Sequence, residues 1–216
     1  LVPLLHLCLP GIDLNDPMKT VSTCMFVLAV SMTVRFGDYS ERDGGHSDDD
    51  DACAVDDDTH TTRGEEDYAV RLASADLDAW CTAFLQRILH LVDNLPDEGK
   101  SGKIGEKNEE MVLHTLVATC DVFCSALSPA LFAHLLDEVL AYARTTVAAS
   151  GVKVIGSLIG CFARADSAAV LARVVPVCCE RIAVELAHGA SSTRTTSTSV
   201  PLEQDTALHW HISMLN

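Results

Sequence analysis

Aromatic residues are scarce in this sequence. Phe, Trp and Tyr make up 5% of the 216 residues, whereas hydrophobic residues as a whole reach 48%. A chain this hydrophobic can build a sizeable core, which excludes disorder over its whole length. Because Ala, Leu and Val dominate the apolar set, the composition favours helices packed on helices over a β-sandwich.

Basic residues are also few: 15 Lys and Arg stand against 31 Asp and Glu, which gives a net charge of −16. A protein that binds nucleic acid or an anionic membrane surface needs a basic face. We therefore expect no nucleic acid and no membrane among the partners. The longest apolar runs, residues 24–34 and 147–163, are either too short for a membrane span or interrupted by glycine and lysine, so no transmembrane helix is expected.

The nine cysteines include no C-x-x-C pair, and most lie within periodic apolar segments. This usage is typical of buried thiols in a reducing compartment, so we expect a cytosolic or nuclear protein. Cys120 and Cys124 share a predicted helix with His114, but a zinc site needs four converging ligands, and core packing is the favoured interpretation. Cys178 and Cys179 are adjacent, so on a helix they diverge by about 100°.

No motif indicates an enzyme class. The sequence has no Gly-x-Ser-x-Gly elbow. His209 and His211 diverge on a helix, on which we expect Leu208, Ile212 and Leu215 to form the apolar stripe. We therefore expect no catalytic residue, no metal ligand and no cofactor.

Apolar residues recur at helical spacing through most of the chain. We predict helices over about residues 1–9, 17–35, 77–95, 106–127, 129–147, 149–164, 167–188 and 204–216. Expected caps are Asn15 or Asp16, Ser74, Ser128, and Asp166 or Ser167, and Pro176 predicts a kink. Expected core stripes are Val21, Cys24, Met25, Leu28 and Met32 in one helix and Leu77, Trp80, Cys81, Phe84, Leu85, Ile88, Leu91 and Val92 in another.

Residues 38–67 differ in kind, because thirteen acids stand there against two arginines and leave a charge of −11. Self-repulsion and the lack of apolar anchors predict a disordered acidic loop. It separates a helical repeat over 1–37 from HEAT-like helical repeats over 68–216.

The predicted helices that begin near Glu106 and Ala149 start about 43 residues apart, within the period of HEAT and armadillo helix pairs. We therefore predict an all-α fold, an α-solenoid of such pairs.

Two segments carry a family resemblance. The first is Leu-Pro-Gly-Ile-Asp-Leu-Asn-Asp at 9–16, and the second is Gly-Ala-Ser-Ser-Thr-Arg-Thr-Thr-Ser-Thr-Ser at 189–199, followed by Leu-His-Trp at 208–210. Together they resemble the middle region of the very large HEAT-repeat proteasome activators, the nuclear ATP-independent activator of animals and its bleomycin-sensitivity homologue in yeast.

This resemblance implies a curved α-solenoid that caps the proteasome core particle at its α-ring and regulates its gate. Such activators promote degradation of peptides and acetylated histones without ATP or ubiquitin, and they are linked to DNA repair. The resemblance also implies inositol polyphosphate binding in the full-length family, for which this sequence offers no matching basic residues. The family docks through a C-terminal hydrophobic–tyrosine–any tail, which residues 213–216 do not match.

One side chain is a candidate for binding an anion or a partner carboxylate. Arg194 lies within the Ser/Thr-rich segment, whose hydroxyls and amides would complete such a site if the segment is ordered, as the resemblance favours; composition alone favours a flexible linker. The alternative function to the proteasome activator is a generic HEAT or armadillo scaffold, such as a transport adaptor that binds peptides on its concave face.

Overall fold

The computed structural model describes residues 1–37, 68–69, 71–72, 74–96, 103–190 and 203–216. Apart from one isolated parallel bridge between Phe36 and Leu127, these residues contain no β-structure, which confirms the all-α prediction. The helices are α1 (Val2–Cys8), α2 (Pro17–Ser31), α4 (Leu77–Asp93), α5 (Lys103–Ala126), α6 (Pro129–Thr145), α7 (Val152–Ala165), α8 (Ser167–Ala187) and α9 (Glu203–Ser213), with short 3₁₀ turns at Leu9–Gly11 and Ala149–Gly151.

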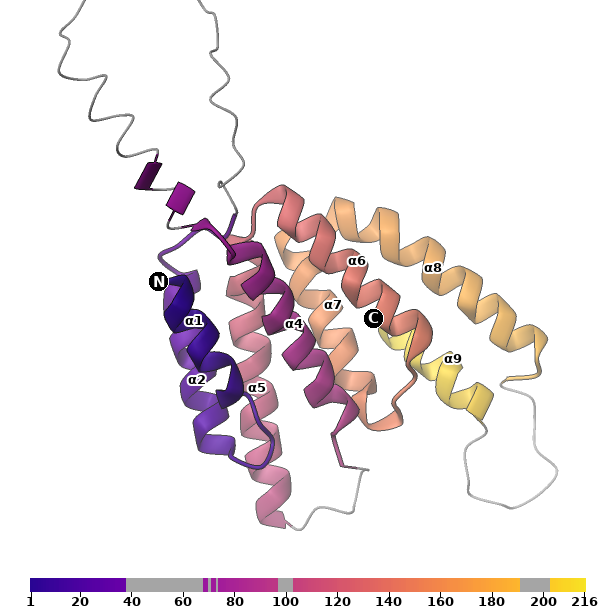
Figure 1. The fold of residues 1–216 in the computed structure, drawn as a ribbon. Coiled ribbons are helices and arrows are strands. Elements are labelled where there is room, and N and C mark those ends of the chain that lie inside the picture. Colours follow the sequence, from indigo (N-terminus) through magenta and orange to yellow (C-terminus); the bar gives the residue numbers. More distant parts are fainter. Residues whose placement is uncertain (38–67, 70, 73, 97–102, 191–202) are drawn as a thin grey trace, which may run out of the picture.

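The helices alternate between two layers (Figure 1). In the first layer α1 contacts α4, α4 contacts α6, and α6 contacts α8; in the second layer α2, α5, α7 and α9 follow one another in the same direction. This alternation is the architecture of a HEAT-type α-solenoid, in which each helix pair packs on the next. As the spacing of about 43 residues predicts, α5 and α7 occupy equivalent places in the second layer.

A cluster of aromatic side chains joins the two layers where α4 of the first layer meets α5 of the second. Trp80 and Phe84 of α4 stack at 5.3 Å between ring centroids, and Phe123 of α5 lies edge-on at 5.0 Å from Phe84. Phe36, which follows α2, inserts its fully buried ring at 5.5 Å from Trp80. Its main chain is fixed by hydrogen bonds to Ala126 and Ser128, so the chain leaving α2 is anchored to the junction of α5 and α6.

Three of the four predicted caps are confirmed. Carboxylate oxygens of Asp16 and Asp166 and the hydroxyl of Ser128 accept hydrogen bonds from main-chain amides in the first turns of α2, α8 and α6. The Ser74 cap is wrong. Its hydroxyl donates to the carbonyl of Arg71, while Asp76 takes the cap position with a left-handed φ of 64° and no side-chain cap bond.

The stripe expected on α2 is wrong in part. Cys24 is buried, but Met25 and Met32 are exposed, and the helix ends at Ser31 and not near residue 35. The buried positions are Thr20, Thr23, Cys24, Val27, Val30 and Ser31. Almost every side chain of this helix is apolar or small, so periodicity alone does not distinguish its two faces. In α4, by contrast, every predicted core residue is buried.

A similar correction applies to α9. Ile212 and Leu215 are exposed, whereas Ala207, Trp210 and Met214 form the buried face. The helix α8 continues through Pro176, and the predicted kink stays a prediction. The predicted acidic loop at 38–67 lies outside the described residues. Among the helices described, none has both the length and the apolar character of a bilayer span.

Candidate functional site

The turn between the 3₁₀ segment and α2 is built around one hydroxyl, that of Thr20. Its oxygen accepts a hydrogen bond from the amide of Asp13 at 2.8 Å and lies 2.6 Å from the carbonyl oxygen of Asp13. It also lies 3.2 Å from the carbonyl oxygen of Gly11. Since Thr20 is fully buried at the base of α2, this hydroxyl fixes the path of residues 11–13.

Gly11 is required by a close approach to α2. A Cβ atom at this position would lie 2.0 Å from the hydroxyl oxygen of Thr23, far inside any van der Waals contact. The next residue, Ile12, is 2% exposed and anchors the turn in the core. The Pro-Gly-Ile-Asp string therefore encodes a packed turn, and the Asn-Asp that follows begins the next helix.

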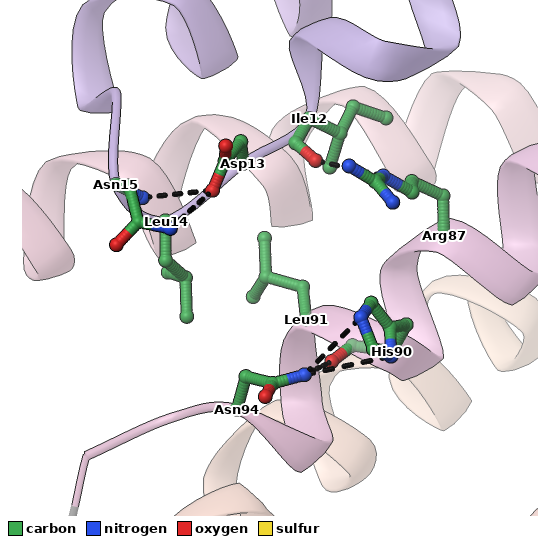
Figure 2. A pocket seen from close by; sticks show the side chains of 8 residues that line it. All are labelled: Ile12, Asp13, Leu14, Asn15, Arg87, His90, Leu91 and Asn94. Carbon is green, nitrogen blue, oxygen red and sulfur yellow. Dashed lines mark hydrogen bonds between the residues drawn. The ribbon is translucent and has the colours of Figure 1, made fainter.

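This turn and the outward face of α4 enclose a hollow of about 310 Å³ (Figure 2). Its lining residues are Ile12, Asp13, Leu14, Asn15, Arg87, His90, Leu91 and Asn94. Arg87 spans the two elements, because its Nε donates a hydrogen bond of 2.9 Å to the carbonyl of Ile12. At the C-terminal end of α4, the side-chain amide of Asn94 donates a hydrogen bond of 2.7 Å to the main-chain carbonyl of His90. A second hollow of about 350 Å³ shares Arg87 and His90 and adds Leu9, Pro10, Ala83 and Gln86.

The side chains that line the hollow include both an acid, Asp13, and a base, Arg87. The amide of Asn15 donates to the Asp13 carboxylate at 2.9 Å, and this bond, aided by nearby Arg87, lowers the pKa of Asp13 below its ordinary value. A carboxylate, a guanidinium, an imidazole and two side-chain amides thus border one polar hollow. This set can hydrogen-bond a polar segment of another molecule, but it brings no nucleophile together with a base.

The second segment that carries the resemblance, residues 189–199, begins just after the C-terminal end of α8. Gly189 has a φ of +92°, and its amide bonds to the carbonyl of Leu186 while the amide of Ala190 bonds to that of Glu185. This pair of bonds is a Schellman motif, which favours glycine at the left-handed position. Ala190 is buried against it. The predicted anion-binding residue Arg194 lies outside the described residues.

Of the cysteines singled out in the sequence, Cys120, Cys124 and Cys178 are buried packing residues. Cys120 and Cys124 are buried in α5, and burial raises the pKa of both thiols well above the ordinary value. Cys161 of α7 donates to the carbonyl of Val117 at 3.5 Å, and its pKa is raised to about 11. Because the thiolate is the reactive form, these positions are unsuited to nucleophilic chemistry. As predicted, the neighbours Cys178 and Cys179 diverge, one buried and the other exposed.

The two histidines of α9 also diverge. His211 is 3% exposed and its Nδ1 has no hydrogen-bond partner, whereas His209 is exposed. Burial lowers the pKa of His211, with Arg181 contributing and Glu185 opposing. Within the described ranges, no three His, Cys, Asp or Glu side chains gather in a way that could hold a metal ion.

The comparison with family models decides the identity of the chain. The model described as the mid HEAT repeats region of proteasome activator complex subunit 4 matches residues 1–216. This chain belongs to that family. A search of curated proteins finds no match. The family assignment confirms the resemblance drawn from the sequence, and the two-layered helix pairs are consistent with its HEAT repeats.

In this HEAT-repeat chain the residues that carried the resemblance have structural roles. Gly11, Gly189 and Trp210 hold a turn, a helix end and an interhelical contact in place. The sequence pattern does not reveal the polar hollow, because Arg87, His90 and Asn94 look like the ordinary solvated face of a helix. Their spacing of three and four residues puts them on one face, but only the fold brings the 12–15 turn opposite them.

Proposed function

We propose that this chain forms part of the wall of a proteasome activator that caps the core particle at its α-ring and regulates its gate. The observation that carries the proposal is the family match over residues 1–216. In this role the chain is a non-catalytic scaffold with no resident cofactor. The assembled activator promotes degradation of peptides and acetylated histones without ATP or ubiquitin, in the nucleus and the cytoplasm, and takes part in DNA repair.

The two-layered packing supports a wall. Contacts between successive pairs are extensive in the second layer, where α2, α5 and α7 follow side by side, and Trp80, Phe84 and Phe123 tie the layers together. Stacked pairs of this kind form a stiff, extended surface whose curvature depends on small rotations between repeats. Such a surface suits the lining of a chamber through which peptides pass.

The test is peptide hydrolysis by purified core particles in the absence of ATP. The natural polypeptide that contains these residues is expected to increase hydrolysis of a fluorogenic peptide severalfold and to co-sediment with the core particle. The isolated 216-residue chain is expected to do neither, because the proposal gives it the wall and not the docking contact. A natural polypeptide that binds peptides but neither binds nor stimulates the core particle would instead support the adaptor function.

A matched pair of variants links the effect to this wall. Trp80→Ala removes the centre of the aromatic cluster and is expected to abolish stimulation by the natural polypeptide, whereas Met111→Ala alters a partly exposed side chain and is expected to keep it. Equal stimulation by both variants would show that the fold of these residues is not needed for the activity.

A further inference from the structure

Two neighbouring hollows follow the outward face of α4. The hollow of about 310 Å³ in Figure 2 and the hollow of about 350 Å³ beside it both border Arg87 and His90. Their lining along α4 extends from Ala83 to Asn94 at its C-terminal end, which is about 16 Å of helix at about 1.5 Å per residue. We call the two hollows together the α4 trough. An extended polypeptide rises by about 3.3 Å per residue, so a segment of about five residues matches this length.

Arg87 is oriented by one hydrogen bond and keeps most of its donors free. Its Nε donates to the carbonyl of Ile12 at 2.9 Å. Neither of its Nη atoms has a hydrogen-bond or ion-pair partner among the residues that the structure describes. The N–H groups on these two atoms lie in the plane that the Nε bond fixes. They can therefore donate to a carbonyl oxygen of a ligand with little further ordering of the side chain.

On the turn side of the trough, Asp13 supplies an acceptor. Its Oδ1 accepts hydrogen bonds from the main-chain amide of Asn15 at 2.9 Å and from the side-chain amide of the same residue at 3.0 Å. Within the described ranges, Oδ2 has no partner. The bond from the Asn15 main chain lowers the pKa of Asp13, so this group is ionised at neutral pH. Arg87 contributes to the lowered pKa, but the two side chains form no ion pair with each other, so both can bind a ligand at once.

Three side-chain amides add further groups to the trough. The nitrogen of Asn15 bonds to Asp13 and that of Asn94 to the carbonyl of His90, which leaves each side-chain oxygen as an acceptor. Gln86 has no hydrogen-bond partner in the part of the chain that the structure describes. An extended polypeptide presents both N–H and C=O groups along its length, so it can use the donors and the acceptors together. A phosphate or a carboxylate would use the donors alone.

Charge distinguishes between polypeptides that could occupy the trough. Asp13 and Arg87 balance each other there, but the chain as a whole carries a net charge of −16. The field of such a chain repels an acidic segment and attracts a basic one. In Figure 2, Leu14 and Leu91 lie between the polar side chains and provide an apolar floor for small side chains. The trough therefore suits a neutral or basic segment.

We propose that the α4 trough binds an extended polypeptide segment of neutral or basic composition through its main chain. Arg87 donates to a carbonyl of the segment, and Asp13 accepts from one of its amides. The side-chain oxygens of Asn15 and Asn94 accept from further amides. Because these contacts are to the main chain, the site tolerates many sequences and discriminates by charge. The proposal concerns binding by this chain alone, so it is independent of any effect on the proteasome.

Binding of blocked pentapeptides, followed by NMR on the isotopically labelled chain, tests the proposal. The probe is acetyl-Ala-Ser-Ala-Ser-Ala-amide at millimolar concentration. The Nε–H signal of Arg87 and the side-chain amide signals of Gln86 and Asn94 are expected to shift together. An analogue in which esters replace the internal amides loses its main-chain donors, so its Kd is expected to rise at least fivefold. The acidic peptide acetyl-Ala-Glu-Ala-Glu-Ala-amide is expected to bind at least fivefold more weakly than the neutral probe.

Matched variants assign the contacts on the chain. Asp13→Asn exchanges the free acceptor for a donor and is expected to raise the Kd of the neutral probe at least fivefold, whereas Glu110→Gln alters an exposed carboxylate of α5 and is expected to leave it unchanged. Arg87→Lys keeps the charge but loses the planar pair of Nη donors and is expected to weaken binding. Arg144→Lys makes the same change at an exposed position of α6 and is expected to have no effect.

Equal Kd values for the amide and ester peptides, or for the neutral and acidic peptides, would overturn the proposal. So would the same Kd in the Asp13 and Glu110 variants. Trough signals that do not move at millimolar probe would also overturn it, because the probe then binds elsewhere or not at all. No core particle is present in these measurements, so their failure is distinguishable from failure to stimulate peptide hydrolysis.

Discussion

The indole Nε1 of Trp210 donates a hydrogen bond of 3.1 Å to the main-chain carbonyl of Ala143. This bond joins α9 to the last turn of α6, and the indole is completely buried there. A Cβ atom on Gly151 would lie 3.5 Å from the Trp210 ring and only 2.4 Å from Val92, so α4, α6 and the turn before α7 all meet near this side chain. Trp210 of α9 is thus bonded to α6 and packed beside the turn before α7, close to α4.

Replacing Trp210 by Phe is expected to destabilise the chain more than the same change at Trp80. Both rings are fully buried, so both changes remove similar apolar area. Only Trp210→Phe also leaves a buried carbonyl without its donor, which costs about 1–3 kcal/mol. The Nε1 of Trp80 has no partner to lose. Urea unfolding of the two variants measures the difference, and equal losses would contradict a stabilising role for the bond to Ala143.

The fold could be predicted from the sequence where one helix face is clearly apolar. In α4, apolar residues alternate with Asp78, Gln86 and Arg87, so periodicity identified both the helix and its buried face. In α2 it identified the helix but not the face, because Met18 and Met25 are as apolar as the buried Val27. Which side of such a helix is covered depends on tertiary packing, which a single-helix pattern does not contain.

The hollow beside α4 could not be predicted for a different reason. Arg87, His90 and Asn94 show a polar helix face, and Asp13 and Asn15 show a turn, but the two lie more than 70 positions apart. No spacing rule links them; they meet because Ile12 is buried and accepts the Arg87 hydrogen bond. Local signals such as caps and glycine turns were predictable because neighbouring residues determine them.

Gly11→Ala is expected to destabilise the turn before α2 by about 1–3 kcal/mol, because the new methyl group overlaps the Thr23 hydroxyl. The double variant Gly11→Ala, Thr23→Ala removes that hydroxyl and is expected to recover most of the loss. Thermal unfolding of the two single variants and the double variant gives the coupling between the positions. If the losses are additive, contact with the Thr23 hydroxyl is not the reason that residue 11 must be glycine.

Thiol labelling is expected to separate the cysteines by burial. In a Cys53→Ser background, which removes the thiol outside the described residues, Cys179 should react first with a disulfide reagent and half-buried Cys8 more slowly. The buried thiols should react only in denaturant, since burial both blocks access and raises their pKa, to about 11 for Cys24. Mass spectrometry assigns each site. Fast labelling of Cys120 or Cys124 in the native chain would contradict their place in the core.

His211 is expected to make the chain less stable as the pH falls. Burial lowers the pKa of its imidazole in the folded chain below the ordinary value of 6.5, so the unfolded chain binds the proton more readily. The free energy of unfolding should therefore decrease as the pH falls from 7.5 through 6.5, by at most about 1.4 kcal/mol per pH unit for one proton, and level off below the folded-state pKa. Above pH 7.5 this contribution is fully present.

The matched variants His211→Gln and His209→Gln isolate this effect, because both residues are on α9 but only His211 is buried. Urea unfolding at pH 7.5 and pH 5.5 should show the wild-type decrease in the His209 variant and a smaller decrease in the His211 variant. The pH-dependent part, and not the stability at one pH, is the informative quantity, because a buried glutamine can itself alter packing. If both variants show the same decrease, groups other than His211 cause the pH dependence of the free energy of unfolding.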